Sequence, residues 1–222
     1  MTSDVDDDFE LHKNTNCALA NDLAGILAIG GSEASDASQS VEFWSAEQGS
    51  CVLSDYPREM GDGTVDLVSG RLVACMEDTC EIYQEGSWHH LQRTTVTRYY
   101  HSSATTEEAV LLIGGYSDDS SDHAEHTTEW IAVDGAAAQP GPFNVRHGPR
   151  HCTIQLSSDI IVVTGGRDTG DFVTQYHLTD GAETPLTPLG QPRYSHACGA
   201  YQDADEQQVS YKAVSAMYVV WR

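Results

Sequence analysis

The chain has 222 residues, with 34 acidic against 11 basic side chains and a formal net charge of −23. Such a charge repels nucleic acid and anionic membrane surfaces, so neither is expected as a partner. The sequence has no uncharged apolar run of about 18 residues, the length that a membrane-spanning helix needs. Its polar, acidic start is unlike a secretory signal and predicts a cytoplasmic protein, or an extracellular one if the native N-terminus is missing.

Four short apolar runs recur along the chain, and each predicts a buried β-strand. Three of them end in a pair of glycines, which suits a strand that meets a tight turn or closely packed backbone. The runs are Gly25–Ile29 before Gly30 and Gly31, Arg71–Met76 without glycines, Val110–Ile113 before Gly114 and Gly115, and Ile160–Thr164 before Gly165 and Gly166. A recurrence at this period predicts an array of similar supersecondary units.

A second strand with an acid or amide near its start follows each run. These strands are Val41–Trp44, Cys80–Tyr83, Thr128–Ile131 and Thr174–His177. Each leads into a two-residue turn that contains glycine, namely Gln48–Gly49, Glu85–Gly86, Asp134–Gly135 and Asp180–Gly181. Because glycine accepts the positive φ of a tight turn, the four pairs predict four hairpins.

A third piece, an arginine followed three residues later by a histidine, comes before the apolar run. It occurs as Arg98–His101 and as Arg193–His196, with Arg150–His151 as a looser copy whose histidine is shifted next to the arginine. With a weak outer strand, such as Ser87–Leu91, each unit has four antiparallel strands. Four-stranded sheets repeated radially are the blades of a β-propeller.

In this combination the sequence resembles the Kelch repeat family, over roughly residues 16 to 202. The resemblance implies an all-β fold, a Kelch-type β-propeller of four-stranded antiparallel blades. The chain departs from the pattern at Cys75 and Met76, which stand where glycines belong. It also departs in the outer strand, whose tryptophan remains only as Trp88.

The repeats divide the chain into an acidic disordered tail (1–15), a propeller (16–214) and a divergent C-terminal tail (215–222). The expected blades lie near 16–57, 63–93, 98–143 and 150–189, with an incomplete fifth from 193. Propellers close with about 4–8 blades, and Kelch propellers commonly with about six. We therefore expect an incomplete, open arc whose strand edges are available for self-association.

The links between blades and the loops after the apolar runs are expected on one face, where seven of the 11 basic residues collect. Arginine offers carboxylates a bidentate fork, so this face is predicted to bind a protein or an acidic peptide. The residues assigned to partner binding are Arg98, Arg146, Arg150, Arg167, Arg193, Tyr116 and Asp118. In the alternative interpretation, these arginines pair with acids of neighbouring blades and hold the blades together.

The histidines His101, His151 and His196 recur in or near one register, either as a metal or proton site near a channel or as neutral histidines that are hydrogen-bonded inside the hub. The pair His123 and His126 lies in an acidic loop without ordered ligand spacing, so no metal or other cofactor is predicted.

The six cysteines leave two alternatives open. Cys75 and Cys80 flank a predicted hairpin and are placed either to form a disulfide or to remain thiols, depending on the compartment. Cys152 and Cys198 are expected to be unbonded and to pack as small buried hydrophobes.

The function expected from these features is a non-catalytic protein–protein interaction module. Two alternatives remain: a copper-dependent propeller enzyme similar to galactose oxidase, which would use Tyr and His ligands, and a truncated fragment without function. No convergent set of catalytic groups is present in the sequence, so an enzyme is not expected.

Overall fold

The computed structural model describes residues 26–30, 32–33, 36–37, 39–45, 49–118, 126–202 and 209–212. Gly31, His123 and the two predicted tails, 1–15 and 215–222, lie outside the described residues. The chain divides into two compact units, Met1–Gly61 and Asp62–Arg222. Within the described residues every strand pairing is antiparallel and no α-helix is present, as the predicted all-β class requires.

The first unit contains a three-stranded sheet of order β1-β4-β5 and a small two-stranded ribbon, β2-β3. The strands are β1 (Ile26–Ile29), β2 (Ser32–Glu33), β3 (Asp36–Ala37), β4 (Val41–Ser45) and β5 (Gly49–Val52). Along β4, Val41, Phe43 and Ser45 are buried while Glu42 and Trp44 are exposed, the period-2 alternation of a strand with one covered face.

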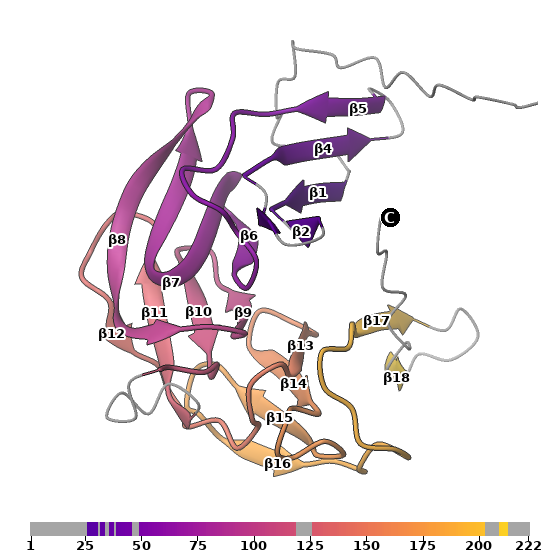
Figure 1. Cartoon of the computed structure of the whole chain (residues 1–222). Helices are drawn as coiled ribbons and strands as arrows, with labels where there is room; N and C mark the ends of the chain where they lie inside the picture. Colours follow the sequence, from indigo (N-terminus) through magenta and orange to yellow (C-terminus); the bar gives the residue numbers. More distant parts are fainter. Residues whose placement is uncertain are drawn as a thin grey trace, which may run out of the picture. The chain divides into compact units, whose positions relative to one another are not determined.

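The second unit contains three larger sheets and a terminal two-stranded ribbon. The first sheet has β6 (Thr64–Val68), β7 (Arg71–Gln84) and β8 (Ser87–Arg98), and the second has β9 (Ser102–Thr105), β10 (Ala109–Ile113), β11 (Thr128–Ala132) and β12 (Gln139–Pro140). The third has β13 (Cys152–Gln155), β14 (Ile160–Thr164), β15 (Val173–His177) and β16 (Glu183–Pro185), and the ribbon has β17 (Gly199–Gln202) and β18 (Val209–Lys212). Each sheet is a simple antiparallel meander (Figure 1).

The strand β7 reverses direction within its length. Its first half pairs with β6 and its second half with β8, and the Cα atoms of Cys75 and Cys80 are only 4.1 Å apart across five residues. The reversal lies at Glu77, whose φ is 55°. Cys75 pairs with the first residue of β6 as Ile113 pairs with the first residue of β9, so Glu77 occupies the position of Gly115. This sheet therefore keeps the turn of the other sheets without their glycine pair.

The four predicted turn glycines have the positive φ that a tight turn requires. Gly49, Gly86, Gly135 and Gly181 have φ between 70° and 82°. Glu85 and Gly86 both have positive φ, the pattern of the two-residue hairpin turn that joins antiparallel strands with the correct twist. A further turn of this kind, Ser69–Gly70, joins β6 to β7 and was not predicted.

The glycine pairs mark a close approach of two backbones. Gly115 has φ 109°, and a Cβ atom there would lie 2.9 Å from the carbonyl oxygen of Tyr99. At Gly166, with φ 115°, a Cβ atom would lie 2.6 Å from the carbonyl oxygen of Gly148. Only glycine fits both the conformation and the space. The predicted structural roles of Gly114 and Gly165, with φ 57° and 67°, and of Gly30, with φ 68°, rest on the same left-handed backbone.

The core of the second unit lies between successive sheets. Val110 and Leu112 of β10 pack towards β7, while the alternate residues Leu111 and Ile113 pack towards β14. Both faces of β10 are therefore covered, which explains why its sequence is a continuous apolar run. On the same side as β14, the rings of Phe143 and Tyr176 stack with their centres 4.4 Å apart.

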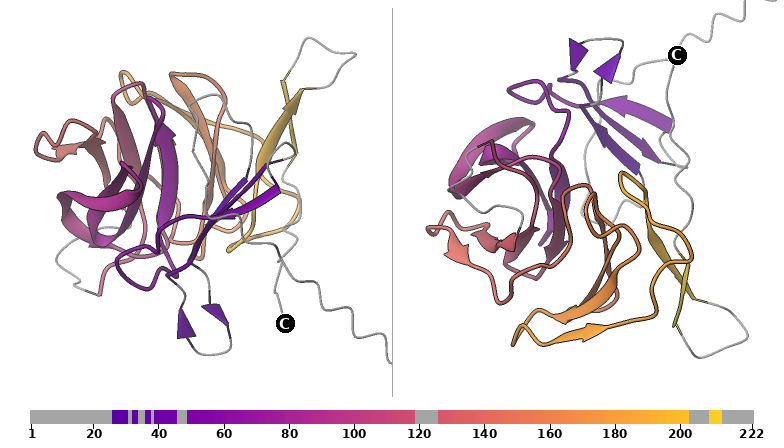
Figure 2. Two further views of the ribbon diagram at one scale, coloured as in Figure 1. Left: turned by 90° about the horizontal axis from the view of Figure 1, so that it is seen from above. Right: turned by 60° about the horizontal axis from the view of Figure 1, so that its bottom comes forward.

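The first strands of the successive sheets form a row in the second unit. β9 contacts β6 on one side and β13 on the other, and β13 in turn contacts β17. The sheet of β13 to β16 thus lies between the β9 sheet and the terminal ribbon, as Figure 2 shows in orange between pink and yellow. We call β6, β9, β13 and β17 the inner strands.

Disulfides occur both within a sheet and between inner strands. Cys75 and Cys80 are bonded across the turn in β7. Cys152, the first residue of β13, is bonded to Cys198, which precedes β17. The prediction that Cys152 and Cys198 are unbonded is wrong; they are half-buried and joined. Cys51 is disulfide-bonded as well.

The described part of the chain contains no helix with the length and apolar character that a membrane crossing requires.

The Cys152–Cys198 bond should contribute more stability than Cys75–Cys80 because it closes a longer segment, 46 residues against five. In the chain-entropy model a loop of that length corresponds to about 4 kcal/mol, and the short one to about 2 kcal/mol. We expect urea unfolding to show a larger loss for C152A/C198A than for C75A/C80A. Equal losses would contradict this ranking.

Candidate functional site

The inner strands are joined at one end by main-chain hydrogen bonds. The N–H of Tyr100 donates to the carbonyl of Asp62, that of Arg150 to Tyr100, and that of Ser195 to Arg150, with N···O distances of 3.3, 3.1 and 2.9 Å. Tyr100, Arg150 and Ser195 all have left-handed backbones, with φ of 55°, 64° and 50°. This conformation is unusual for residues other than glycine and costs about 1 kcal/mol or more each. The four residues thus hold equivalent positions, one for each inner strand.

This register corrects the sequence alignment of the third piece. Each left-handed residue directly precedes a histidine, so His151 is aligned with His101 and His196 and is not shifted. Arg150 therefore occupies the position of Tyr100 and Ser195, and Gly148 stands where the other copies have Arg98 and Arg193. The looser copy is in register but lacks the arginine at that place.

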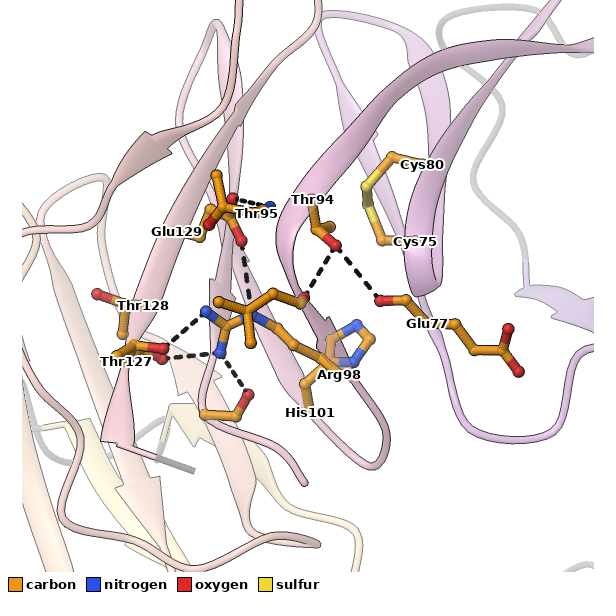
Figure 3. Close-up of polar contacts among 12 residues, drawn as sticks. Cys75, Glu77, Cys80, Thr94, Thr95, Arg98, His101, Thr127, Thr128 and Glu129 are labelled. Atoms are coloured by element: carbon orange, nitrogen blue, oxygen red, sulfur yellow. Dashed lines mark hydrogen bonds and ion pairs between the residues drawn. A yellow bond between two sulfur atoms is a disulfide. The ribbon is translucent and has the colours of Figure 1, made fainter. Parts of the chain in front are cut away.

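Arg98 is wholly buried, so its assignment as a partner-binding residue is wrong. Its Nη1 donates to the carbonyl of Gly114 at 2.9 Å and its Nη2 to the hydroxyl of Thr127 at 2.8 Å (Figure 3). Its Nε lies 3.6 Å from the Glu129 carboxylate, which is also buried. The second oxygen of that carboxylate accepts the main-chain N–H of Thr95 at 2.6 Å. Arg98 and Glu129 hold the end of β8 to the next sheet, as the alternative interpretation proposed for the arginines.

A different pair of residues makes the equivalent contacts in the β13 sheet. His147 bonds through Nδ1 to the carbonyl of Gly165 at 2.8 Å and through Nε2 to the hydroxyl of Thr174 at 3.1 Å. Gly165 corresponds to Gly114, so an imidazole replaces the guanidinium. Thr174, which pairs with Val163 as Glu129 pairs with Leu112, replaces the carboxylate. The buried charged pair is thus exchanged for neutral groups in this sheet.

The repeated histidines link neighbouring inner strands through hydroxyl groups. His101 contacts Thr64, the first residue of β6, at 3.4 Å, and His151 contacts Ser102, the first residue of β9, at 2.8 Å. Cys152 holds the equivalent position in β13 and forms its disulfide instead. His196 there contacts Thr164, which pairs directly with Cys152. No group of three or more His, Cys, Asp or Glu within the described residues could hold a metal ion.

Burial keeps these imidazoles neutral. Desolvation lowers the pKa of His101 and of His151 to about 4, and it also lowers the pKa of His147 and His196. Asp66 of β6 shifts in the opposite direction: its Oδ1 accepts the Ser103 hydroxyl at 3.0 Å, and burial raises its pKa to about 6.

The remaining predicted arginines differ in their surroundings. Arg146 pairs with Glu183 of β16 at 2.5 Å. Arg150 makes no ion pair in the described residues, and its guanidinium carbon lies 4.0 Å from the centre of the Tyr100 ring. Arg167 is exposed and makes no side-chain ion pair within that same part of the chain. Arg193 is half-buried, and its carbonyl accepts the N–H of Gly166.

Tyr116 and Arg167 are equivalent residues, each directly following a glycine pair. Tyr116 exchanges two main-chain hydrogen bonds with Tyr99, both of 2.7 Å, and Arg167 donates its N–H to the carbonyl of Pro149 at 3.0 Å. Each is thus fixed beside a residue that precedes an inner strand. Tyr116 is 40% exposed, and Asp118 follows it as an exposed residue at the edge of the described range.

Main-chain hydrogen bonds, or adjacency in the chain to a residue that makes one, relate seven residues that we call the link face: Asp62, Tyr99, Tyr100, Tyr116, Arg150, Arg167 and Tyr194. It brings together three predicted site residues, Tyr116, Arg150 and Arg167. Sequence reasoning missed Asp62, Tyr99, Tyr100 and Tyr194. The position directly before each repeated histidine was a signal that could have found Tyr100. Aromatic residues and arginine are the types that dominate the energetic centres of protein interfaces.

Comparisons with known proteins place the fold and not the function. No family model matches the chain, and no curated protein matches its sequence. A solved structure titled "Structure of YjhT" is similar in fold, with a TM-score of 0.62 and 11% sequence identity. The similarity covers 80% of this chain and 69% of that chain.

The variant Arg98→Met should lose about 3–5 kcal/mol of unfolding free energy because it leaves the Glu129 carboxylate buried without a counter-charge. The double variant R98M/E129Q removes that charge and should recover part of the loss. Urea unfolding of both variants measures the difference. A single variant no less stable than the double one would show that the pair is not coupled.

Acidification should destabilise the fold between pH 6.5 and about 4. In this range His101 and His151 are protonated in the unfolded chain but stay neutral in the folded one, where their pKa is lowered to about 4. Asp66 acts in the opposite sense, since its folded pKa is raised to about 6 and protonation favours the fold. Unfolding free energies across this range should therefore fall more steeply in Asp66→Asn and less steeply in His151→Gln. A pH-independent stability would contradict the assignment of neutral imidazoles.

Proposed function

We propose that the chain is a non-catalytic interaction module of the Kelch-repeat propeller type, which binds an acidic peptide of a partner protein on the link face. The row of inner strands, the meandering sheets and the glycine pairs support the propeller assignment. The similarity to YjhT supports it at the level of fold alone.

One observation carries the binding proposal. The main chain of Arg167 is hydrogen-bonded to Pro149, the residue before Arg150, and neither arginine has an ion pair among the described residues, in a chain of net charge −23. An acidic chain has carboxylates with which to neutralise its arginines, as Arg98, Arg93 and Arg146 show. Stacking on Tyr100 holds the Arg150 side chain in place, and its guanidinium has no ion pair among the described residues. An arginine guanidinium that is already held in place binds a carboxylate with little further loss of side-chain entropy.

The disulfides support an oxidising compartment for this function. Thiols are kept reduced in the cytoplasm, whereas Cys75–Cys80 and Cys152–Cys198 are both bonded. We therefore favour an extracellular or similar location over the cytoplasmic one that the N-terminal sequence suggested.

The double variant R150Q/R167Q tests the proposal. A phage-displayed random peptide library selected on the native protein should yield peptides rich in Asp and Glu. Fluorescence anisotropy should show the variant binding them about tenfold or more weakly, because one charge-assisted hydrogen bond contributes about 1.5–3 kcal/mol.

The matched control is R93Q/R146Q, which removes two exposed arginines that are already paired with acids at 3.1 and 2.5 Å. Exposed pairs contribute only about 0–1 kcal/mol each, so this variant should remain folded and bind peptide normally. Equal weakening in both double variants, or a library without any binder, would overturn the proposal.

A further inference from the structure

The link face has an acidic side as well as a basic one. Asp62 is bonded through its carbonyl to Tyr100, and Glu77 stands at the glycine-pair position of the preceding sheet. Asp118 lies two residues after Tyr116, whose main chain pairs with Tyr99. Main-chain geometry thus gathers three carboxylates around Tyr99, with a fourth, Asp78, paired to Arg93 at 3.1 Å.

The pKa of the Tyr99 hydroxyl reflects these carboxylates. Desolvation raises its pKa, and the charges of Glu77, Asp118, Asp78 and Asp62 raise it further. Partial burial also raises the pKa of Asp62, while the nearby Tyr100 hydroxyl and Arg150 guanidinium oppose that rise. Tyr100 therefore lies between an acid on one side and an arginine on the other.

The order of the main-chain bonds sets the distance between the two sides. Asp62 is bonded to Tyr100 and Tyr100 to Arg150, so two steps separate the acid from the arginine. Main chains joined by such bonds lie about 4.8 Å apart, so the main chains of Asp62 and Arg150 are about 10 Å apart. In a polyproline II segment, residues three positions apart share one side and are separated by about 9 Å.

A uniformly acidic segment fits only half of this surface. Its carboxylates can bind Arg150 and Arg167, but those that extend past Tyr100 meet Asp62 and its acidic neighbours. Juxtaposed like charges oppose binding and so discriminate against such a partner. A segment that places a cation there is attracted on both sides.

We propose that the partner segment is bipolar, with a Lys or Arg against Asp62 and an Asp or Glu against Arg150, three positions apart in an extended chain. This inference rests on the proposed function of the link face and specifies the chemistry of its partner. The two charges fix the direction in which the segment lies across Tyr100.

Three labelled peptides of equal length test the inference by anisotropy at low ionic strength. They carry Lys-Pro-Pro-Glu, Glu-Pro-Pro-Glu or Lys-Glu-Pro-Pro in the same Gly-Ser flanks. The first should bind at least fivefold more tightly than either of the others. Asp62→Asn should reduce that preference to less than twofold, whereas the matched single-charge control Glu108→Gln, an exposed residue of another turn, should preserve it.

Each alternative result separates the two proposals. Equal or tighter binding of Glu-Pro-Pro-Glu would overturn the bipolar partner and leave the acidic-peptide module standing. Equal binding of Lys-Glu-Pro-Pro would overturn the three-position spacing. Loss of the preference in Glu108→Gln would show that it follows net charge and not the link face. If none of the three peptides binds, both the partner chemistry and the proposed function fail.

Discussion

The main-chain hydrogen bonds between the starts of the inner strands are the constraint on which the second unit depends. They join Asp62, Tyr100, Arg150 and Ser195 in sequence, and three of these residues take a left-handed backbone to do so. The glycine pairs serve the same contact, because a side chain at Gly115 or Gly166 would collide with the backbone it approaches. The sheets are thus registered by backbone geometry first, and the apolar side chains between them fill the space that this register defines.

Side chains reinforce that register with groups that differ from sheet to sheet. The β9 sheet uses a buried arginine and glutamate, and the β13 sheet uses His147 with the hydroxyl of Thr174. The hydroxyl beneath His101 and His151 is replaced by Cys152 in the last link, where a disulfide joins the strands. The replacements of the arginine and of the glutamate are coupled, because replacing only one of them would leave the other charge buried without a partner. The last sheet of the row, built from a two-stranded ribbon, gains a covalent bond where fewer strand contacts exist.

The sequence predicted most of the strands because their signals are local. Apolar runs, turn glycines and second strands each depend on neighbouring residues. In three units the structure places these strands within a residue or two of the expected bounds, whereas the run Arg71–Met76 and the strand Cys80–Tyr83 are both parts of β7. The function of individual arginines is less predictable, because the burial of Arg98 depends on groups of the next sheet that surround it. Alignment on the repeated arginines misplaces His151, because Gly148 stands where the other two copies have Arg98 and Arg193. The Cys152–Cys198 bond depends on the pairing of inner strands 46 residues apart, which no local pattern encodes.

The bonds between the left-handed residues have a consequence for how this surface can change over time. Because only the N–H and C=O groups take part, tyrosine, arginine and serine all serve at the same position. Related chains could therefore diverge in what they recognise through substitutions at these points while their architecture stays intact. Selection for a new target would act on positions whose side chains take no part in the main-chain bonds that hold the fold.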